Sequence, residues 1–282
     1  MANRAVIIGC GGVGAAIGYS IMMADVMKEV VFIDPVTDRM EGEVLDIDQG
    51  IGHMSNTVIR SGDYSDCGES DVIIITAGRN RRPGETRRDL LEGNKKILCQ
   101  ILEDIRPYYN NNFMIIISNP VDALTRVAYE CGWIPADKLC GTGCLLDTSR
   151  WICEIAKYLK ADKKEIVGWS VGEHGSNQHI IWDSVRVAGE TIEDYSARNG
   201  IVWNDSVKEQ LQKNVTEMGA AIIARKGRTQ YGIAGVTTYL VKSLLGHEKT
   251  PVSVSCKVDP ETDQMVSAVV YVADGQIWYE DK

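Results

Sequence analysis

The sequence predicts an α/β protein, in which a doubly wound parallel sheet is followed by an α+β domain. Two observations predict this order. Up to about residue 145, short unbroken runs of Val and Ile alternate with helical patterns. Unbroken apolar runs are typical of strands that are buried on both faces, as in a parallel sheet covered by helices. Beyond that point strands and helices no longer alternate one by one, which predicts an α+β domain.

The expected elements follow from these patterns. In the first part we expect strands over residues 4–8, 29–33, 57–60, 71–76 and 113–118, and helices over residues 12–27, 39–50 and 94–109. In the second part we expect helices over residues 147–160, 206–226 and 232–244, and strands over residues 165–171, 179–187, 252–258 and 265–272. No Pro/Ser-rich linker separates the two parts, so we expect them to share a tight interface.

Composition excludes several classes of protein. The chain of 282 residues has a net charge of −9, which argues against a nucleic-acid binder, because such proteins present a basic face. The eight cysteines form no C-x-x-C pair and are interpreted as reduced thiols. No targeting segment or membrane-length apolar run is present, and no metal-ligand cluster stands out. We therefore expect a cytoplasmic protein without metal, membrane or nucleic-acid partners.

A glycine-rich turn follows the first strand. Gly9, Gly11 and Gly14 match G-x-G-x-x-G, and Asp34 ends the second strand, 20 residues beyond Gly14. In this pattern the glycines allow a tight turn, close approach of a pyrophosphate, and close packing of helix on strand. An acid at Asp34 accepts hydrogen bonds from ribose hydroxyls and repels a 2′-phosphate, which favours NAD over NADP. The first domain, residues 1–145, is thus expected to be a Rossmann-type NAD-binding domain.

An arginine-rich loop follows the strand at residues 71–76. Five arginines fall within ten residues, around a Pro-Gly turn: Arg79, Arg81, Arg82, Arg87 and Arg88. A solvated charged loop and a nucleic-acid patch are two readings, but the loop has no aromatic residues and leaves the ligand-binding edge of the sheet. We favour a mobile lid that brings guanidinium groups onto an anionic substrate.

One of the four histidines stands out. His174 lies between Gly172 and Gly175, on a turn after a strand, whereas His53, His179 and His247 are interpreted as structural. Asp147 and Arg150 are three residues apart, so they share one helix face. Apolar neighbours predict a buried start to this helix, where an acid and an arginine need partners. We expect residues 146–282 to form the α+β catalytic and substrate domain.

Together these segments resemble the lactate/malate dehydrogenase family. The resemblance runs from about Arg4 to about Leu245 and is carried by six motifs in order: GCGGVG, FID, TAGRNRRPGETRRDL, ISNPVD, LLDTSR and GEHG. It implies an NAD-dependent 2-hydroxy acid dehydrogenase, with His174 transferring the proton and Asp147 orienting it. Arg87 would polarise the substrate carbonyl, and Arg150 would grip the substrate carboxylate.

The resemblance implies further contacts as well. Asn119 would contact both substrate and nicotinamide, and Thr229 would line the substrate pocket. The expected cofactor contacts are Gly9, Gly11, Gly12, Val13, Gly14, Asp34, Ala77, Gly78, Asn94 and Asn119. A homodimer or homotetramer is expected by family likeness alone.

Arg81 decides the expected substrate. It lies two residues before the loop proline, where the resemblance associates glutamine with lactate and arginine with malate. Facing pyruvate, a second desolvated guanidinium would be an unpaired charge that costs several kcal/mol. We therefore expect (S)-malate and oxaloacetate, and with them a place in the tricarboxylic acid cycle. L-lactate dehydrogenase, or another 2-hydroxy acid dehydrogenase, is the alternative.

Two departures from the family pattern leave other functions open. Gly175-Ser176-Asn177 replaces the usual Gly-Asp after the histidine, and family members continue some 30 residues beyond Lys282 in a long helix, which we expect to be missing here. A non-catalytic NAD-binding protein and an NAD-requiring glycosidase on a related fold are the remaining alternatives. The glycosidase would need a metal site near the nicotinamide.

Overall fold

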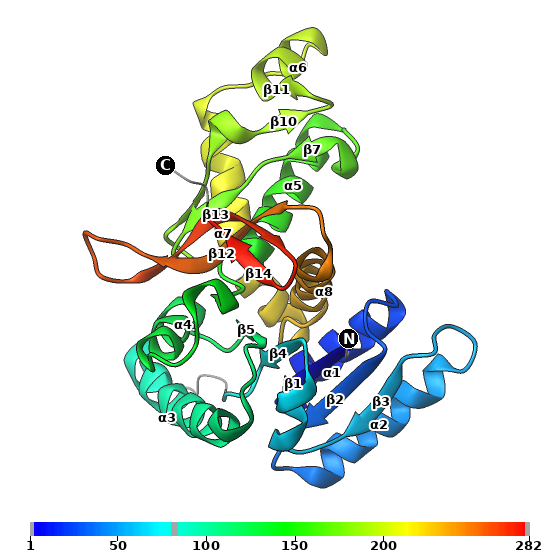
Figure 1. Ribbon diagram of the computed structural model, residues 1–282. Coiled ribbons are helices and arrows are strands. Elements are labelled where there is room, and N and C mark those ends of the chain that lie inside the picture. The colour runs from blue at the N-terminus through cyan, green and yellow to red at the C-terminus, as the bar shows by residue number, and fades with distance from the viewer. Residues whose placement is uncertain (1–2, 80–83, 280–282) are drawn as a thin grey trace.

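The computed structural model describes residues 3–79 and 84–279. Its first half is a parallel sheet in the order β3-β2-β1-β4-β5-β6 (Figure 1). The strands are β1 (Arg4–Ile8), β2 (Glu29–Ile33), β3 (Val58–Ser61), β4 (Val72–Ile75), β5 (Phe113–Ile116) and β6 (Leu139–Gly141). Because the order reverses direction at β1 and β4, the carboxyl ends of these two strands open the crevice where ligands bind in such sheets.

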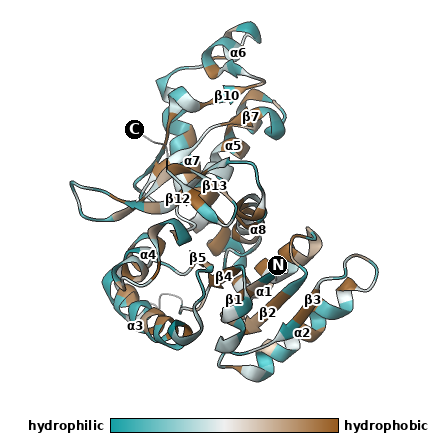
Figure 2. Ribbon diagram, viewed as in Figure 1, coloured by the Kyte–Doolittle hydropathy of each residue, from teal (hydrophilic) through white to brown (hydrophobic). Residues whose placement is uncertain are grey.

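Helices cover both faces of this sheet. The helices α1 (Gly12–Met23), α2 (Thr37–Ile51) and α8 (Tyr231–Leu245) lie on one face, and α3 (Arg87–Ile105) and α4 (Val121–Glu130) lie on the other. Along β1, Ala5 and Ile7 pack on the first face, whereas Val6 and Ile8 pack on the second. This explains the unbroken apolar runs, which Figure 2 shows as hydrophobic strands between helices with hydrophilic outer sides.

The second half continues the same sheet with antiparallel strands. A long hairpin, β12 (Thr250–Val258) and β13 (Met265–Ala273), meets β6 through the pair Ser255 and Gly141. The strands β8 (Ser170–Gly172), β9 (Gln178–Ile180) and β14 (Gln276–Trp278) extend it beyond β13. The predicted fold class is confirmed, but the α+β half shares its main sheet with the first half.

A helical layer and a small sheet complete the second half. The helices are α5 (Leu145–Leu159), α6 (Ile192–Arg198) and α7 (Asp205–Lys226), and the small sheet has the order β11 (Glu190–Thr191), β10 (Arg186–Val187), β7 (Ile166–Val167). They enclose a separate core around Trp151, which is fully buried. Short 3₁₀ turns link the elements: η1 (Tyr64–Glu69), η2 (Arg106–Tyr108), η3 (Ala136–Lys138), η4 (Lys163–Glu165) and η5 (Trp182–Ser184).

Several boundaries differ from the prediction. Helix α3 begins at Arg87, not at residue 94, because Thr86 and Asp89 form a reciprocal capping box that starts the helix early. Helix α1 ends at Met23, and the chain turns at Asp25, which has a positive φ. The expected strands over residues 165–171 and 179–187 are broken into shorter ones, and α4, α6, β6, β11 and β14 were not predicted.

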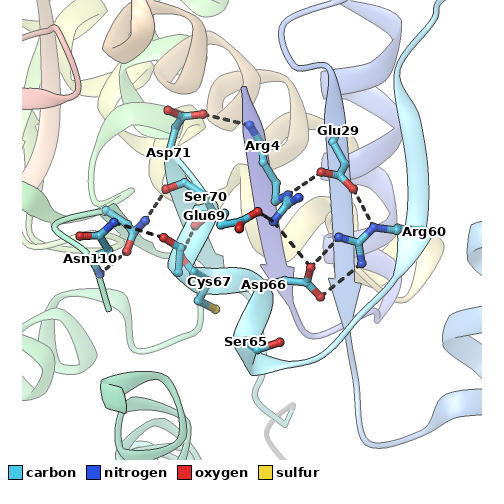
Figure 3. A network of polar contacts seen from close by, with 12 residues as sticks. Arg4, Glu29, Arg60, Ser65, Asp66, Cys67, Glu69, Ser70, Asp71 and Asn110 are labelled. Atoms are coloured by element: carbon cyan, nitrogen blue, oxygen red, sulfur yellow. Dashed lines mark hydrogen bonds and ion pairs between the residues drawn. The ribbon is translucent and has the colours of Figure 1, made fainter. Parts of the chain in front are cut away.

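An ion-pair network joins the first residues of β1 and β2 to β3 and η1 (Figure 3). Glu29 accepts hydrogen bonds from Arg4 and from Arg60, whose Nε lies 2.6 Å away. Arg60 also reaches Asp66 of η1 at 2.5 Å, and Arg4 lies 3.3 Å from Glu69. The two arginines lower the pKa of Glu29 against the opposing effect of burial. The network therefore joins β1, β2, β3 and η1 through side chains that come from separate parts of the chain.

We predict that Gly14→Ala destabilises the fold. A Cβ on Gly14 would lie 1.9 Å from the carbonyl oxygen of Gly9, so the backbone must shift. The expected loss is about 1–3 kcal/mol in the free energy of unfolding, measured by urea denaturation.

The matched control is Gly42→Ala in α2, where a Cβ meets nothing within 4 Å. That change should stabilise by roughly 0.5–1 kcal/mol, since it only removes the helix penalty of glycine. Equal effects of the two substitutions would contradict the close packing of helix on strand.

Candidate active site

The glycine turn lies at the carboxyl end of β1. Gly9 has a φ of +103°, and a Cβ there would lie 2.5 Å from the backbone nitrogen of Ala77. At Gly11, in contrast, a Cβ would meet nothing within 4 Å. The turn is therefore tightly packed beneath and open above, just where α1 begins at Gly12. An open helix N-terminus of this kind binds phosphate through its free backbone N–H groups.

Asp34, at the end of β2, lies against the same turn. Its Oδ2 accepts a hydrogen bond from the backbone N–H of Cys10 at 2.7 Å, and its Oδ1 accepts one from Val36 at 2.9 Å. Arg39 reaches the same carboxylate at 3.0 Å. The side chain is only 7% exposed. The structure thus holds the acid in one orientation beside the glycine turn, and its contact with the ribose stays a prediction.

The ends of β4 and β5 are joined by Asn94 of α3. Its Oδ1 accepts from the backbone N–H of Arg79 at 2.9 Å, and its Nδ2 donates to the carbonyl of Asn119 at 2.7 Å. A Cβ on Gly78 would lie 3.4 Å from the Asn94 side chain. Asn94 is 2% exposed, so its side chain holds two loops together in this structure. Its expected contact with the cofactor stays a prediction.

The second half contributes a buried acid with two cationic partners. Asp147 is 2% exposed in the first turn of α5, and its Oδ1 accepts from Nη1 of Arg150 at 2.9 Å. Its Oδ2 lies 2.6 Å from Nδ1 of His174, on the turn after β8. Because an ionised carboxylate is an acceptor only, it fixes the tautomer with hydrogen on Nδ1 whenever the imidazole is neutral. The other ring nitrogen, Nε2, then carries the free lone pair.

Asp122 is a site residue that the sequence analysis missed. It lies in the first turn of α4, and its Oδ2 accepts a hydrogen bond from the backbone N–H of His174 at 2.8 Å. Burial raises the pKa of Asp122 above its ordinary value, against the opposing effect of this hydrogen bond. The motif ISNPVD was recognised, but its acid was given no role. A carboxylate three residues after Asn119, in the first turn of a helix, was the available signal.

The pKa of His174 reflects two opposing causes. Burial alone would lower it, but the hydrogen bond and the negative charge of Asp147 outweigh burial, so the pKa lies above the ordinary value of 6.5. Arg150 opposes part of this increase. An imidazole can act as a base when neutral and as an acid when protonated, and the raised pKa favours the protonated form.

A small cavity of about 100 Å³ joins these groups. Both halves of the chain line it: Val13, Ile117, Asn119, Val121, Thr142, Gly143, Leu146, Arg150, His174, Thr229 and Ile233. Five of the predicted site residues therefore meet here, namely Val13, Asn119, Arg150, His174 and Thr229. His53, His179 and His247 do not line it, and His247 is instead exposed and paired with Asp274 at 2.7 Å.

Two predicted residues lie outside the description. Arg81 is among residues 80–83, which the structure does not describe, and only the backbone of Arg87, at the start of α3, is described. In the rest of the predicted loop, Arg79 pairs with Glu85 at 2.6 Å. Among the described residues, no group of three or more His, Cys, Asp or Glu side chains is arranged to hold a metal ion. No described helix is long and apolar enough to cross a membrane.

The residues present fit a dinucleotide. An open glycine turn, a helix N-terminus and an oriented acid follow one another along the crevice, and the cavity with His174 lies at the other side of the turn. This is the arrangement of an NAD-binding α/β enzyme, in which an acid–base residue from a second domain reaches the crevice.

Comparison with family models places the chain within this class. Residues 3–141 match the lactate/malate dehydrogenase NAD-binding domain, and residues 144–274 match the lactate/malate dehydrogenase alpha/beta C-terminal domain. The protein belongs to the lactate/malate dehydrogenase family. NAD as the cofactor is confirmed, and so is the general class of NAD-dependent oxidoreductase acting on a small hydroxy or keto acid.

Several relatives of this chain are L-lactate dehydrogenases. The chain is 35% identical over 253 residues to an L-lactate dehydrogenase of Clostridium botulinum (strain Loch Maree / Type A3), covering 90% of this chain and 80% of the relative. It is 35% identical over 263 residues to L-lactate dehydrogenase 2 of Lactococcus lactis subsp. lactis (strain IL1403), covering 93% and 83%.

A solved structure agrees with these relatives. The minor L-lactate dehydrogenase of Enterococcus mundtii has a TM-score of 0.93 and 32% identity, covering 99% of this chain and 90% of that one. The expected preference for malate, and a place in the tricarboxylic acid cycle, receive no support from these relatives.

We predict that Asp147→Asn lowers the pKa of His174 below its ordinary value. The substitution removes the charge and hydrogen bond that raise the pKa and leaves burial, which lowers it. Histidine Cε1–Hε1 shifts in NMR titrations measure this pKa directly. In the wild type, the stabilisation from this pair is complete below the pKa of unfolded histidine and is lost as pH rises through the higher folded value. Asp147→Asn should reverse the sign of that pH dependence, because a folded pKa below the unfolded one makes stability rise with pH.

Glu173→Gln is the matched control. It removes the carboxylate adjacent to His174 in sequence, which bonds Asn177 at 2.7 Å rather than the imidazole. An unchanged His174 titration in Asp147→Asn would refute the assignment of the pKa increase to Asp147.

Proposed function

We propose that this protein interconverts L-lactate and pyruvate with NAD as cofactor. The contact of His174 with buried Asp147, beside Arg150 and a cavity next to the glycine turn, is the observation that carries the proposal. Lactate is favoured over other hydroxy acids because the relatives and the solved structure described above are L-lactate dehydrogenases.

The positions of the side chains support a separate role for each group in the reaction. A bound NAD would supply the acceptor for the hydride that leaves C2 of the hydroxy acid. Nε2 of His174 takes the proton of the C2 hydroxyl, while Asp147 stabilises the resulting imidazolium through Nδ1. Such a positioned acid–base group contributes roughly 10²–10⁴-fold in rate.

Arginines would orient the substrate. Arg150 holds a carboxylate through parallel N–H···O bonds, since only one edge of its guanidinium is used by Asp147. Arg87 stabilises negative charge on the C2 oxygen, and Asn119 and Thr229 line the cavity around it.

Malate and oxaloacetate are the second candidate pair, for one reason. Arg81 precedes the loop proline by two residues, and a second guanidinium facing the substrate pairs best with a second carboxylate. Lactate is the main proposal because the whole-chain likeness favours it, whereas Arg81 is a single position outside the described residues.

The test measures kcat/KM for pyruvate and oxaloacetate side by side, by NADH absorbance. We expect the wild type to prefer pyruvate. Arg81→Gln should then lower activity with oxaloacetate by about tenfold or more, the usual effect of losing one charged pair, and leave pyruvate unchanged.

Arg88→Gln removes the same charge from an exposed position in α3 and serves as the control. The wild type could instead prefer oxaloacetate and lose that preference in Arg81→Gln but not in Arg88→Gln. In that case malate would replace lactate as the proposed substrate. If neither keto acid is turned over, the remaining interpretation is a non-catalytic NAD-binding protein.

We propose further that the chain forms a homo-oligomer through the face of α1 and α8. These helices pack together, yet Tyr19, Met23, Tyr231 and Tyr239 on them are 42–70% exposed. Beside them lies an open cavity of about 710 Å³ between α5, α8 and β12. Apolar surface of this kind is typical of subunit interfaces. We expect a second copy of the chain to cover this surface, because the exposed apolar side chains continue onto α2, next to α1, where Leu45 is 61% exposed.

We expect Tyr239→Glu to lower the mass measured by light scattering after size-exclusion chromatography, because a buried unpaired charge disfavours association. Tyr108→Glu, at a 44% exposed tyrosine beyond α3, is the control and should leave the mass unchanged. A monomeric wild type, or equal effects of both variants, would overturn this interface.

A further inference from the structure

Arg228 lies against the first residue of α1. A Cβ on Gly12 would be 3.0 Å from Cζ, 3.1 Å from Nε and 3.3 Å from Nη1 of Arg228. The two residues are far apart in the chain: Gly12 belongs to the glycine turn, and Arg228 lies between α7 and α8. The second half therefore places a guanidinium directly over the glycine turn.

This guanidinium has no carboxylate partner among the described residues. Its Nε donates to Oε1 of Gln230 at 2.5 Å, and no salt bridge involves it within residues 3–79 and 84–279. Arg228 is exposed, whereas Arg39, whose partner Asp34 lies against the same turn, is held in an ion pair at 3.0 Å. The Nη groups are thus available as donors to a ligand.

Its position is electrostatically unfavourable without an anion. The N-terminus of a helix carries a partial positive charge, and the first N–H groups of α1 lack acceptors within the helix. A guanidinium placed beside this end repels it. An anion between the two removes the repulsion and accepts hydrogen bonds from both sides. The space above Gly11, where a Cβ would meet nothing within 4 Å, is available for that anion.

We propose that Arg228 binds the pyrophosphate of NAD and holds it against the N-terminus of α1. The cofactor is then gripped from both halves of the chain, by backbone N–H groups of the first half and by a side chain of the second. The inference deepens the proposed function, since it rests on NAD binding, but it does not depend on which hydroxy acid is the substrate.

Placement next to Thr229 gives the contact a second effect. Thr229 lines the cavity that contains His174 and Arg150, and one peptide bond joins it to Arg228. A pyrophosphate held by Arg228 therefore also fixes the segment that forms one wall of the substrate cavity. Arg228 is a cofactor-binding residue that positions Thr229 through the backbone.

The test is the binding of three ligands to Arg228→Gln, without turnover. NADH fluorescence gives the dissociation constant of NADH, and competition gives those of ADP-ribose, which contains the pyrophosphate, and of adenosine, which does not. We expect about tenfold weaker binding of NADH and ADP-ribose, as for the loss of one charge-assisted hydrogen bond, and unchanged binding of adenosine. The thermal midpoint of the variant without ligand should equal that of the wild type, because the side chain is exposed.

Arg225→Gln is the matched control. Arg225 lies one turn earlier, at the end of α7, and its guanidinium bonds the carbonyl of Ala221 within its own helix at 2.8 Å. Removing it changes the net charge equally and should leave all three dissociation constants unchanged.

Three results would overturn the proposal: unchanged NADH binding in Arg228→Gln, equal weakening by Arg225→Gln, or equal weakening of adenosine and ADP-ribose. The last would mean a distorted site rather than a lost phosphate contact. Normal NADH binding to the wild type without turnover of any keto acid would refute the proposed function and leave this inference standing.

Discussion

The buried carboxylate of Asp147 is the interaction on which the candidate site depends. It is almost fully inaccessible, and its two oxygens bond Arg150 and His174. An ionised acid in such a place is tolerated only with partners on both sides, because the loss of hydration is otherwise too costly. The same constraint fixes the imidazole tautomer, raises the pKa of His174, and occupies one edge of the arginine while leaving the rest for substrate. The position of His174, its protonation and the orientation proposed for the substrate thus all depend on Asp147.

A second constraint is the contact between the halves. The turn with His174 is held by Asp122 of α4, which follows the Asn119 loop of the first half, and the segment with Thr229 leads into α8, which packs on α1. The turn with His174 and the segment with Thr229 are therefore both supported by the first half of the chain. The cavity lies where the two halves meet, and Val13, within the glycine turn, is part of its lining.

Much of the fold could be predicted because its signals are local. The glycine pattern, Asp34, and the Val/Ile runs each describe a short segment, and the structure contains them where the sequence indicated. The start of α3 was predicted too late in the chain. The segment before residue 94 is polar and arginine-rich and has no apolar periodicity, so it did not indicate a helix, although a capping box begins the helix there. The contact of His174 with Asp147 was expected from the family motifs alone. Asp122 and Arg228 were missed, because their partners lie 52 and 216 positions away, and no pattern within one segment encodes such distances.

Helix α8 has a consequence for how this chain can be divided. Although it comes late in the sequence, Leu240, Val241 and Leu244 are buried in the core that also holds α1 and the inner residues of β1. A fragment ending near residue 145 would keep every parallel strand and yet lose the helix that seals one side of them. The apolar face that α8 covers would then be exposed to solvent and would promote aggregation. Shuffling modules between relatives of this protein should therefore exchange α8 together with the sheet that it covers.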